Sequence, residues 1–502
     1  MTKTRITLCI LCAATALLAA CNKDSRNEIE NNTQKSYLTV QFGVSSPLTK
    51  TDNSGSLIEG TEAESSVSKA VVYLVQSGQV KAILPVNTLN RISHSGYDNG
   101  YETSVLETNV AVGTYDVYVY AGTSFDPFGY SIGGQWKGET TRTFAAKTVD
   151  GVENASNTAA NDFGFKMFSQ NDASVTGSDI PQVTLTSANN TSANPAVAGN
   201  VYLDRITAKV TADEDAALTI NSNVKQGSFS AATAKIDGIL PVSAAQTVYI
   251  QQQWADAGKT KLSTPATERY GFINNLFTTT GSAYADIQYS GGEYSSVAVS
   301  DLGGKIIPVS SAMYVLENAA EATPVWGSTT GVVFKVTLDA TGSGTPSTFF
   351  GYNKNSEHFL SLADLQAGYP DAFDTFGNKL ADGVSDDDAA NLAAAEALLA
   401  SDVAAFRART KVYVFEDGAM YYTFFIKDNN YNNYGVFRNT WYQLLVTEIT
   451  NFGDDIPGGW NPDNPTVNPE PETPVEDEKL YIKVKILVNK WVSNVTTIHL
   501  GE

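Results

Sequence analysis

Apolar and polar positions alternate in many short runs along the chain, and this period of two predicts β-strands. The first run is one extended segment, residues 37–44, from Tyr37 to Val44. A second run, residues 114–120, follows the glycine turn at Gly113. A third, residues 201–211, has the pattern of a strand that opens a second β domain. Because turns rich in Gly, Ser and Asn separate these runs, the sequence predicts an all-β fold.

One segment departs from the strand period. Residues 389–409 repeat their apolar side chains at helical spacing, after three aspartates at 386–388. Ser385 is the predicted N-cap, and acidic residues in the first turn suit the helix dipole. The aspartates are an alternative metal site, although an ordinary helix start explains them more simply. Residues 411–416 and 420–427 then predict a hairpin around Asp417 and Gly418.

The C-terminal region combines a polar linker with an apolar strand. Residues 454–478 are rich in Pro, Asn and acidic residues, so we expect them to be extended and unpacked, reaching on the order of 70 Å. Lys483 and Lys485 occupy one face of the strand that follows. The opposite face carries Leu480, Ile482, Val484, Ile486 and Val488. This strand either completes its own sheet or inserts into a neighbouring molecule, and the pattern alone leaves both open.

Insertion would require a vacant groove in the receiving molecule. The strand at residues 37–44 is the candidate occupant, with Tyr37, Leu38, Val40, Phe42 and Val44 as its characteristic side chains. The loop at residues 45–66 is polar, and exposed loops of this kind are preferred sites of proteolysis. Cleavage at Lys50 would allow the strand to leave. Repeated insertion from subunit to subunit would give an open, head-to-tail filament.

The N-terminus has the pattern of an export signal. A basic start and an apolar run at residues 6–18 lead into Leu18-Ala19-Ala20-Cys21, and the run is too short for a membrane-spanning anchor. The segment resembles bacterial lipoprotein signals, which implies cleavage before Cys21 and acylation of its thiol. Cys9 and Cys12 lie inside the signal, so their spacing is not a redox or zinc motif. Membrane contact is therefore expected only through the lipid of the precursor.

Charge and motif content exclude several classes of function. The net charge of −21 argues against nucleic acid as a partner. The histidines His94, His358 and His499 lack carboxylate or cysteine companions at ligand spacing, and the sequence holds no H-E-x-x-H, Walker or G-x-S-x-G motif. The abundant carboxylates leave a glycosidase pair open, but nothing in the sequence singles out two of them. We therefore expect neither an enzyme nor a cofactor.

A surface glycan-binding lipoprotein is the alternative function. Such sites use exposed aromatic side chains, and the candidates are Trp136, Trp254, Trp326, Tyr431 and Tyr434. Aromatic packing inside the β domains is the simpler role for most of them. The linker and terminal strand distinguish the two functions, because a monomeric glycan binder has no need of them.

Several short segments together resemble the Bacteroidia fimbrillins, and most closely the minor-fimbrium (Mfa-type) shaft subunits of type V pili. They are the lipobox ending at Cys21 and residues 113–118, 205–210, 434–442 and 488–491. The resemblance implies two β-sandwich-like (transthyretin-like) domains in series and transport to the outer membrane. It also implies proteolytic loss of the first strand and its replacement by another subunit's C-terminal strand. Members of the family are often cut after Arg, whereas this loop offers Lys50.

The expected partners are further copies of this chain, accessory anchor and tip subunits, and a protease of trypsin-like specificity. The expected function is that of a structural subunit of a surface fimbrium that supports adhesion and biofilm formation. The expected organisation is a signal peptide at 1–20, a propeptide at 21–50, an N-terminal β domain at 51–196, a C-terminal β domain at 197–453 with a helix at 386–409, a linker at 454–478 and a donor-strand region at 479–502.

Overall fold

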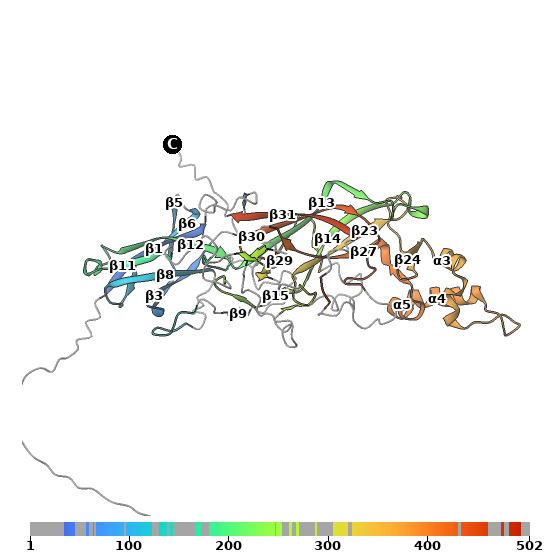
Figure 1. The fold of residues 1–502 in the computed structure, drawn as a ribbon, viewed down its shortest axis with the longest axis horizontal. Coiled ribbons are helices and arrows are strands. Elements are labelled where there is room, and N and C mark those ends of the chain that lie inside the picture. The colour runs from blue at the N-terminus through green and yellow to red at the C-terminus, as the bar shows by residue number, and fades with distance from the viewer. Residues whose placement is uncertain are drawn as a thin grey trace, which may run out of the picture.

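The computed structural model describes about two thirds of the chain, and within it the protein is mostly β, with several sheets and few helices (Figure 1). The described residues are 35–45, 57–59, 64, 67–94, 97–122, 130–137, 141–143, 166–171, 180–245, 247–253, 261–263, 268–270, 287–288, 305–319, 324–429, 433–459, 473–475 and 481–492. Cys21, Lys50 and Leu480 lie outside them, as do Trp254, Tyr431 and His499.

The first sheet contains the strand predicted at residues 37–44, which the structure confirms as β1. Ten strands join in this sheet in the order β4-β3-β8-β10-β12-β1-β6-β5, with β7 paired to β1 and β11 to β8. Their bounds are β1 Ser36–Ser45, β3 Lys69–Gln76, β4 Gln79–Val86, β5 Leu89–His94, β6 Tyr97–Thr103, β7 Leu106–Thr108, β8 Gly113–Gly122, β10 Met167–Ser169, β11 Gln182–Leu185 and β12 Ala196–Arg205. Ser77 and Gly78, both at positive φ, form the tight turn of the β3–β4 hairpin.

The next part of the chain builds two facing sheets. One has the order β2-β31-β30-β13-β21 and the other β20-β14-β23-β27. The bounds are β2 Leu57–Glu59, β13 Thr207–Ile220, β14 Thr233–Val242, β20 Ile307–Pro308, β21 Ala312–Leu316, β23 Gly331–Asp339, β27 Ala419–Phe425, β30 Thr440–Ile449 and β31 Ile482–Val492. Val210, Leu444 and Ile482 from the first of these sheets share one buried cluster with Phe334 and Met420 from the second. This shared core is the mark of a sandwich.

Short strands complete the described β structure. They are β9 Thr141–Thr143, β15 Ala244–Ala245, β16 Thr247–Tyr249, β17 Lys261–Ser263, β18 Glu268–Tyr270, β19 Ile287–Gln288, β22 Asn318–Ala319, β24 Phe349–Tyr352, β25 Glu357–Phe359, β26 Tyr413–Phe415, β28 Lys427–Asp428 and β29 Asn433–Val436. The short 3-10 helices are η2 Ser187–Asn189, η3 Gly227–Phe229, η5 Pro370–Phe376 and η6 Glu416–Gly418.

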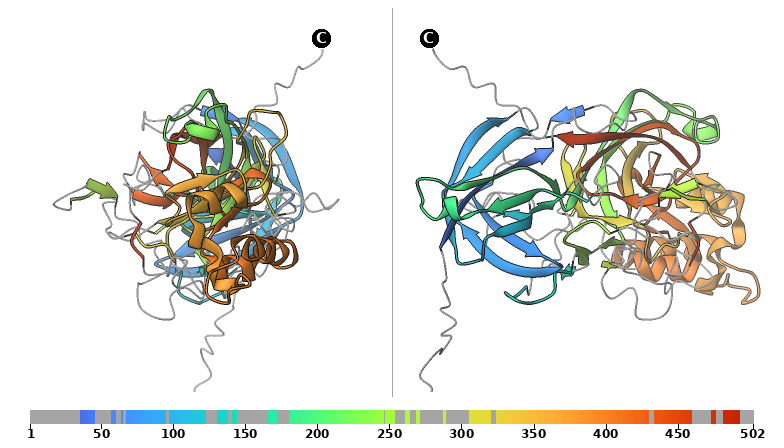
Figure 2. Two further views of the ribbon diagram at one scale, coloured as in Figure 1. Left: turned by 90° about the vertical axis from the view of Figure 1, so that its right-hand side faces the viewer. Right: turned by 60° about the vertical axis from the view of Figure 1, so that its left-hand side comes forward.

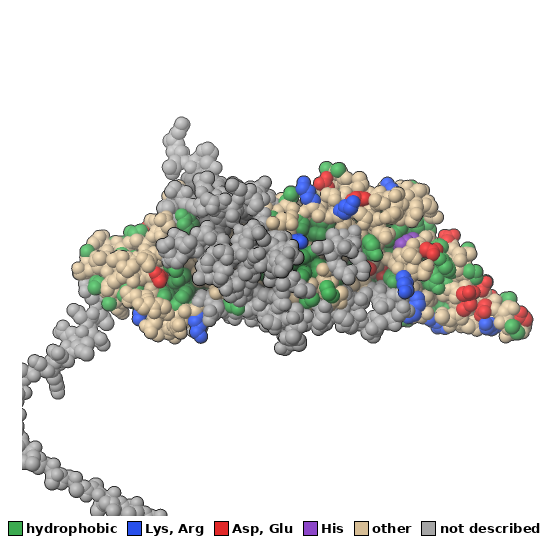
Figure 3. Space-filling model, viewed as in Figure 1, with side chains coloured by type: hydrophobic (Ala, Val, Ile, Leu, Met, Phe, Trp, Pro, Cys, Tyr) green, Lys and Arg blue, Asp and Glu red, His purple; other side chains and the backbone are tan. Residues whose placement is uncertain are grey.

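Three described α-helices lie at the end of the elongated molecule that is opposite the first sheet (Figure 1). They are α3 Leu362–Gly368, α4 Asp388–Ser401 and α5 Val403–Thr410. The predicted helix at 389–409 is therefore a pair, interrupted at Asp402, whose carboxylate accepts a hydrogen bond from Ala405 and caps α5. The predicted cap Ser385 is wrong, because Asp387 accepts the hydrogen bond from Ala390 that caps α4. Acidic side chains gather at this end of the surface (Figure 3).

The predicted hairpin around Asp417 and Gly418 is also wrong. β26 pairs with β24, whereas β27 pairs with β23 in a different sheet. Both turn residues have positive φ, and a Cβ on Gly418 would lie 2.1 Å from the carbonyl oxygen of Leu338 in β23. This close approach directs the chain from one sheet to the next instead of folding it back.

The run at residues 201–211 is divided between two sheets. Its first half belongs to β12, in the same sheet as β1, and β13 begins only at Thr207. The expectation that Val201 opens the second β domain is therefore wrong. Both halves alternate with the same period, so the pattern could not show that the chain changes sheet near Ile206.

Candidate functional site

β1 lies in the interior of the first sheet, with hydrogen-bonded neighbours on both edges. It runs parallel to β12 and antiparallel to β6 and β7. Leu38, Val40 and Phe42 are each 0% exposed, and they belong to the main core of this part of the molecule. Full burial stabilises by roughly 1.5–3 kcal/mol per side chain, so these three contribute roughly 5–9 kcal/mol. A strand seated in this way leaves a large groove if it is removed.

Polar contacts fix the register of β1. The backbone N–H of Val40 donates to Thr103 Oγ1 at 3.1 Å, and Gln41 Nε2 donates to Glu102 Oε1 at 3.0 Å. At the start of the strand, the Tyr37 hydroxyl donates to Glu107 Oε2 at 3.1 Å. Phe42 stacks against Tyr101, with ring centroids 5.9 Å apart. These partners lie on β6 and β7 or directly beside them, so this pair of strands forms one wall of the β1 groove.

β31 is the strand predicted at the C-terminus, and in this structure it lies against its own chain. It runs antiparallel to β30, from Ile449↔Ile482 to Thr440↔Lys490. Ile482 is 1% and Val488 8% exposed, and Val484 and Ile486 are partly buried against the same core. Lys483 is on the solvent side, where it pairs with Glu448 at 2.6 Å. The apolar face therefore contacts its own sheet in the monomer.

β1 and β31 differ in how firmly neighbouring strands hold them in their sheets. Within the described residues β1 has neighbours along both edges, whereas β31 has β30 on one edge and β2 only at residues 490–492 on the other. Val484 and Ile486 also retain some exposure, unlike Leu38, Val40 and Phe42 of β1. An edge strand with a half-buried face is the easier of the two to detach.

The expectation that the linker does not pack is wrong at its described ends. Asp455 is 0% exposed and pairs with Arg407 Nε of α5 at 2.6 Å. Near the other end, the N–H of Trp326 donates to the Thr473 carbonyl at 2.9 Å, and the N–H of Val475 donates to the Pro324 carbonyl at 2.9 Å. The linker preceding β31 is thus fixed at two points to the part of the chain that contains the sandwich and its helices.

A buried charged cluster joins the first sheet to the sandwich formed by the β13 and β14 sheets. The sequence did not reveal this cluster. Arg438 Nε donates to Glu317 Oε2 at 2.6 Å, while its two terminal nitrogens donate to the carbonyls of Ile250 and Tyr249. Arg205, 0% exposed, donates to the side chain of Asn439 at 2.9 Å. An arginine inside an apolar strand region was the available signal, because such a residue is seldom buried without partners.

The candidate glycan-binding aromatics that the structure describes are packed. Trp136 stacks between Tyr118 and Tyr130, with centroids 4.3 and 4.5 Å away. Trp326 meets Phe425 edge to face at 4.9 Å, and Tyr434 packs against the same cluster. All three side chains are partly buried and pack against neighbouring aromatic or apolar side chains.

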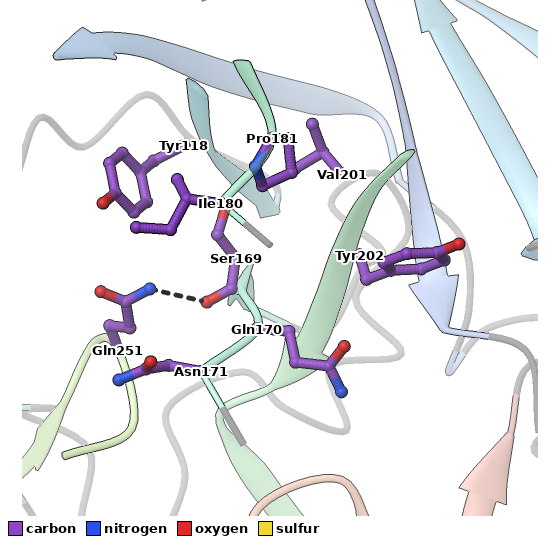
Figure 4. A pocket seen from close by; sticks show the side chains of 9 residues that line it. All are labelled: Tyr118, Ser169, Gln170, Asn171, Ile180, Pro181, Val201, Tyr202 and Gln251. Carbon is purple, nitrogen blue, oxygen red and sulfur yellow. Dashed lines mark hydrogen bonds between the residues drawn. The ribbon is translucent and has the colours of Figure 1, made fainter. Parts of the chain in front are cut away.

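One small pocket opens beside the first sheet (Figure 4). Its volume is about 70 Å³, and Tyr118, Ile180 and Val201 supply apolar walls. Gln251 Nε2 crosses it to donate to the carbonyl of Ser169 at 3.3 Å. Burial raises the pKa of the Tyr118 hydroxyl to about 12, so the phenol stays neutral.

The described part of the chain contains no group of three or more His, Cys, Asp or Glu side chains arranged to hold a metal ion. The aspartates at 386–388 instead serve the helix start, where Asp386 pairs with Lys379 at 2.6 Å and Asp387 caps α4. His358 is partly buried, with its ring stacked on that of Phe452 at 3.5 Å between centroids, and desolvation lowers its pKa to about 3. Among the described helices none is long and apolar enough to cross a membrane.

Residues 413–497 match the family model described as "Major fimbrial subunit protein type IV, Fimbrillin, C-terminal". The matched segment starts at β26 and contains both β30 and β31, so it includes the C-terminal strand and its neighbour in the sheet. The family so described consists of fimbrial structural subunits and is non-enzymatic.

Three solved structures are similar over most of the chain, at low identity. A candidate cell adhesion protein from Parabacteroides distasonis ATCC 8503 is 13% identical with a TM-score of 0.44, covering 91% of this chain and 100% of that one. The fimbrilin FimA from Porphyromonas gingivalis W83 is 14% identical with a TM-score of 0.39, covering 91% and 99%. The tip fimbrial protein Mfa3 from Porphyromonas gingivalis, with a C-terminal truncation, is 12% identical with a TM-score of 0.33, covering 91% and 100%. A comparison with curated proteins finds no match.

Proposed function

We propose that this protein is a structural shaft subunit of a cell-surface fimbrium that polymerises by strand exchange. It is exported as a lipoprotein acylated at Cys21 and built from two sandwich-like, transthyretin-like domains in series. Cleavage at Lys50 releases β1, and β31 of another subunit fills the vacated groove. Anchor and tip subunits terminate the fibre, and the assembled fibre supports adhesion and biofilm formation. No cofactor takes part.

This proposal rests mainly on the position of β1 in the chain. The strand has a buried apolar face, and the loop that follows it contains a single lysine or arginine. Leu38, Val40 and Phe42 are completely buried, and Lys50 is the one basic residue between positions 46 and 66. A cut there leaves β1 attached to the molecule only by noncovalent contacts. The match of residues 413–497 to a fimbrial family model supports the same class of function.

The two strands have compatible patterns for exchange. β1 presents Leu38, Val40 and Phe42 to the core at alternate positions, and β31 presents Ile482, Val484, Ile486 and Val488 in the same way. Strand addition restores the backbone hydrogen bonds along β12 and β6, while the alternate side chains refill the groove. Before donating, β31 must leave β30 of its own subunit, so exchange replaces one set of contacts with another.

Polymerisation of the purified chain lacking residues 1–20 tests the proposal. Limited digestion with trypsin is expected to give ladders that resist mild SDS, and a Lys50→Gln variant is expected to give none. Removing residues 479–502 should also abolish the ladders. If the cut protein stays monomeric and keeps β31 protected, strand exchange is refuted.

A matched pair of substitutions in β31 separates the donor face from general effects of mutation. Val484 points toward the core and Lys485 toward solvent. Val484→Asp is expected to prevent ladder formation, because a carboxylate would have to be buried in the acceptor groove. Lys485→Asp introduces the same group on the solvent side and should leave the ladders intact. Equal effects of the two variants would contradict the assigned donor face.

A further inference from the structure

A short strand that follows the proposed cleavage loop contacts the end of β31. β2 pairs in parallel with its last residues, Leu57↔Lys490, Ile58↔Trp491 and Glu59↔Val492. Figure 2 shows this blue strand beside the arrowhead of the red β31. Within the described residues, β2 is the one strand on this outer edge of β31. The C-terminal end of β31 is therefore held on both sides, although its beginning is held on one.

The segment that begins with β2 is fixed at a second point, Glu64. This carboxylate is 2% exposed, and its Oε1 lies 2.9 Å from Lys209 Nζ. The hydroxyl of Tyr314 donates to the same oxygen. Arg205 Nε donates to the backbone carbonyl of Glu64 at 2.8 Å. Contacts from β12, β13 and β21 thus hold one residue in the junction between the first sheet and the second sandwich.

This anchor lies next to the part of β31 that β2 contacts. Lys209 Nζ is 3.6 Å from the centroid of the Trp441 ring, so the ammonium that binds Glu64 also covers this tryptophan. Trp441 is in β30 and pairs directly with Asn489 of β31. The Glu64 contacts and the β2 pairing therefore act on one end of the same sheet.

We propose that β2 and Glu64 together form a retaining segment that keeps the end of β31 on its own subunit until the preceding loop is cut. A strand of three residues is too short to persist by itself, so its pairing depends on how firmly its two ends are fixed. Glu64 fixes the downstream end, and β1 fixes the upstream end. Cleavage between β1 and β2 removes the upstream attachment. One cut then opens the acceptor groove and loosens the donor strand of the same molecule.

Hydrogen exchange of the uncut monomer tests the retaining segment. Replacing residues 57–59 by Gly-Ser-Gly keeps the chain length and removes the strand side chains of β2. We expect the amides of residues 489–492 to exchange at least about tenfold faster, because their opening no longer requires β2 to detach. The same replacement in β9, another three-residue strand, which pairs with β16, is the matched control and should leave these amides unchanged. Unchanged exchange in the β2 variant would overturn the proposal.

A Glu64→Gln variant tests the anchor. Glutamine keeps the size of the side chain and an acceptor for Tyr314, but it leaves the Lys209 ammonium without its carboxylate. Faster exchange confined to the end of β31 supports the role of Glu64 in the retaining segment. Acceleration spread evenly over both sheets would mean that Glu64 only stabilises the junction, and this part of the proposal would fail.

The role that we assign to the retaining segment depends on the proposed function, but the experiment that tests the segment does not. Exchange rates in the uncut monomer report on β2 and β31 whether or not the protein polymerises. If the β2 variant loosens β31 but trypsin-cut protein forms no ladders, the contact is real and the fimbrial function is wrong. If ladders form while the β2 variant exchanges like the parent, strand exchange stands and the retaining segment does not.

Discussion

Replacing Phe42 by alanine removes the largest apolar side chain that β1 places in the core. The ring is 0% exposed and stacks on Tyr101 at 5.9 Å. Buried Phe→Ala changes cost about 3–5 kcal/mol, and the lost stacking partner places this site near the middle of that range or above it. A loss of about 4 kcal/mol should lower the Tm of the transition that includes the first sheet by roughly 10 °C.

Urea and thermal unfolding, followed by tryptophan fluorescence, measure this loss in the uncut monomer. Gln41→Ala is the matched control, because Gln41 is the neighbouring residue on the opposite face and its side chain donates a hydrogen bond to Glu102. That control should cost only about 0.5–1.5 kcal/mol. If Phe42→Ala costs no more than the control, β1 is not packed as described and the reasoning about its groove is refuted.

The same variant gives a second readout after cleavage. If β1 leaves the molecule on polymerisation, residue 42 is absent from the fibre, so parent and variant fibres should be equally stable. The variant should also release β1 faster after the cut, because fewer contacts hold it. A stability difference that persists in the fibre would show that β1 remains in place.

Two further predictions concern buried ionisable groups. Arg438→Leu leaves Glu317 buried without its cation and should destabilise by about 3–5 kcal/mol, whereas the double variant with Glu317→Leu should recover most of this loss in urea unfolding. Burial lowers the pKa of His358 to about 3, below its unfolded value, so its contribution is fully present above pH 6.5 and falls as the pH decreases toward 3. Between pH 8 and pH 5 the parent should therefore lose up to about 2 kcal/mol more stability than His358→Phe. Equal pH dependence of the two proteins would contradict the burial of a neutral imidazole.

The local pattern was sufficient for most single elements. Alternation predicted β1, β8 and β31, because successive residues of each strand differ in polarity between its two faces. Helical spacing predicted α4 and α5, although the break at Asp402 was missed since Val403 and Phe406 continue the apolar face across it. The apolar face of β31 was likewise predicted from the period alone.

What the pattern could not supply was the partner of each strand. The residues flanking Gly418 alternate like a hairpin, but the close approach to Leu338 sends them into different sheets. The linker composition predicted an unpacked chain, yet Asp455 is buried because Arg407, far back in the sequence, neutralises it. Pairings of this kind depend on residues that are remote along the chain.

The sequence by itself determined that this protein is a β-rich chain with one apolar strand at residues 37–44, another after residue 479, and a basic residue after the first. Only the tertiary structure decided that β1 is enclosed on both edges while β31 is enclosed mainly on one. Only the tertiary structure brought Glu64 to Lys209 and β2 to the end of β31. Periodicity records which face of a strand is buried, whereas the identity of a neighbouring strand depends on how distant segments share one core.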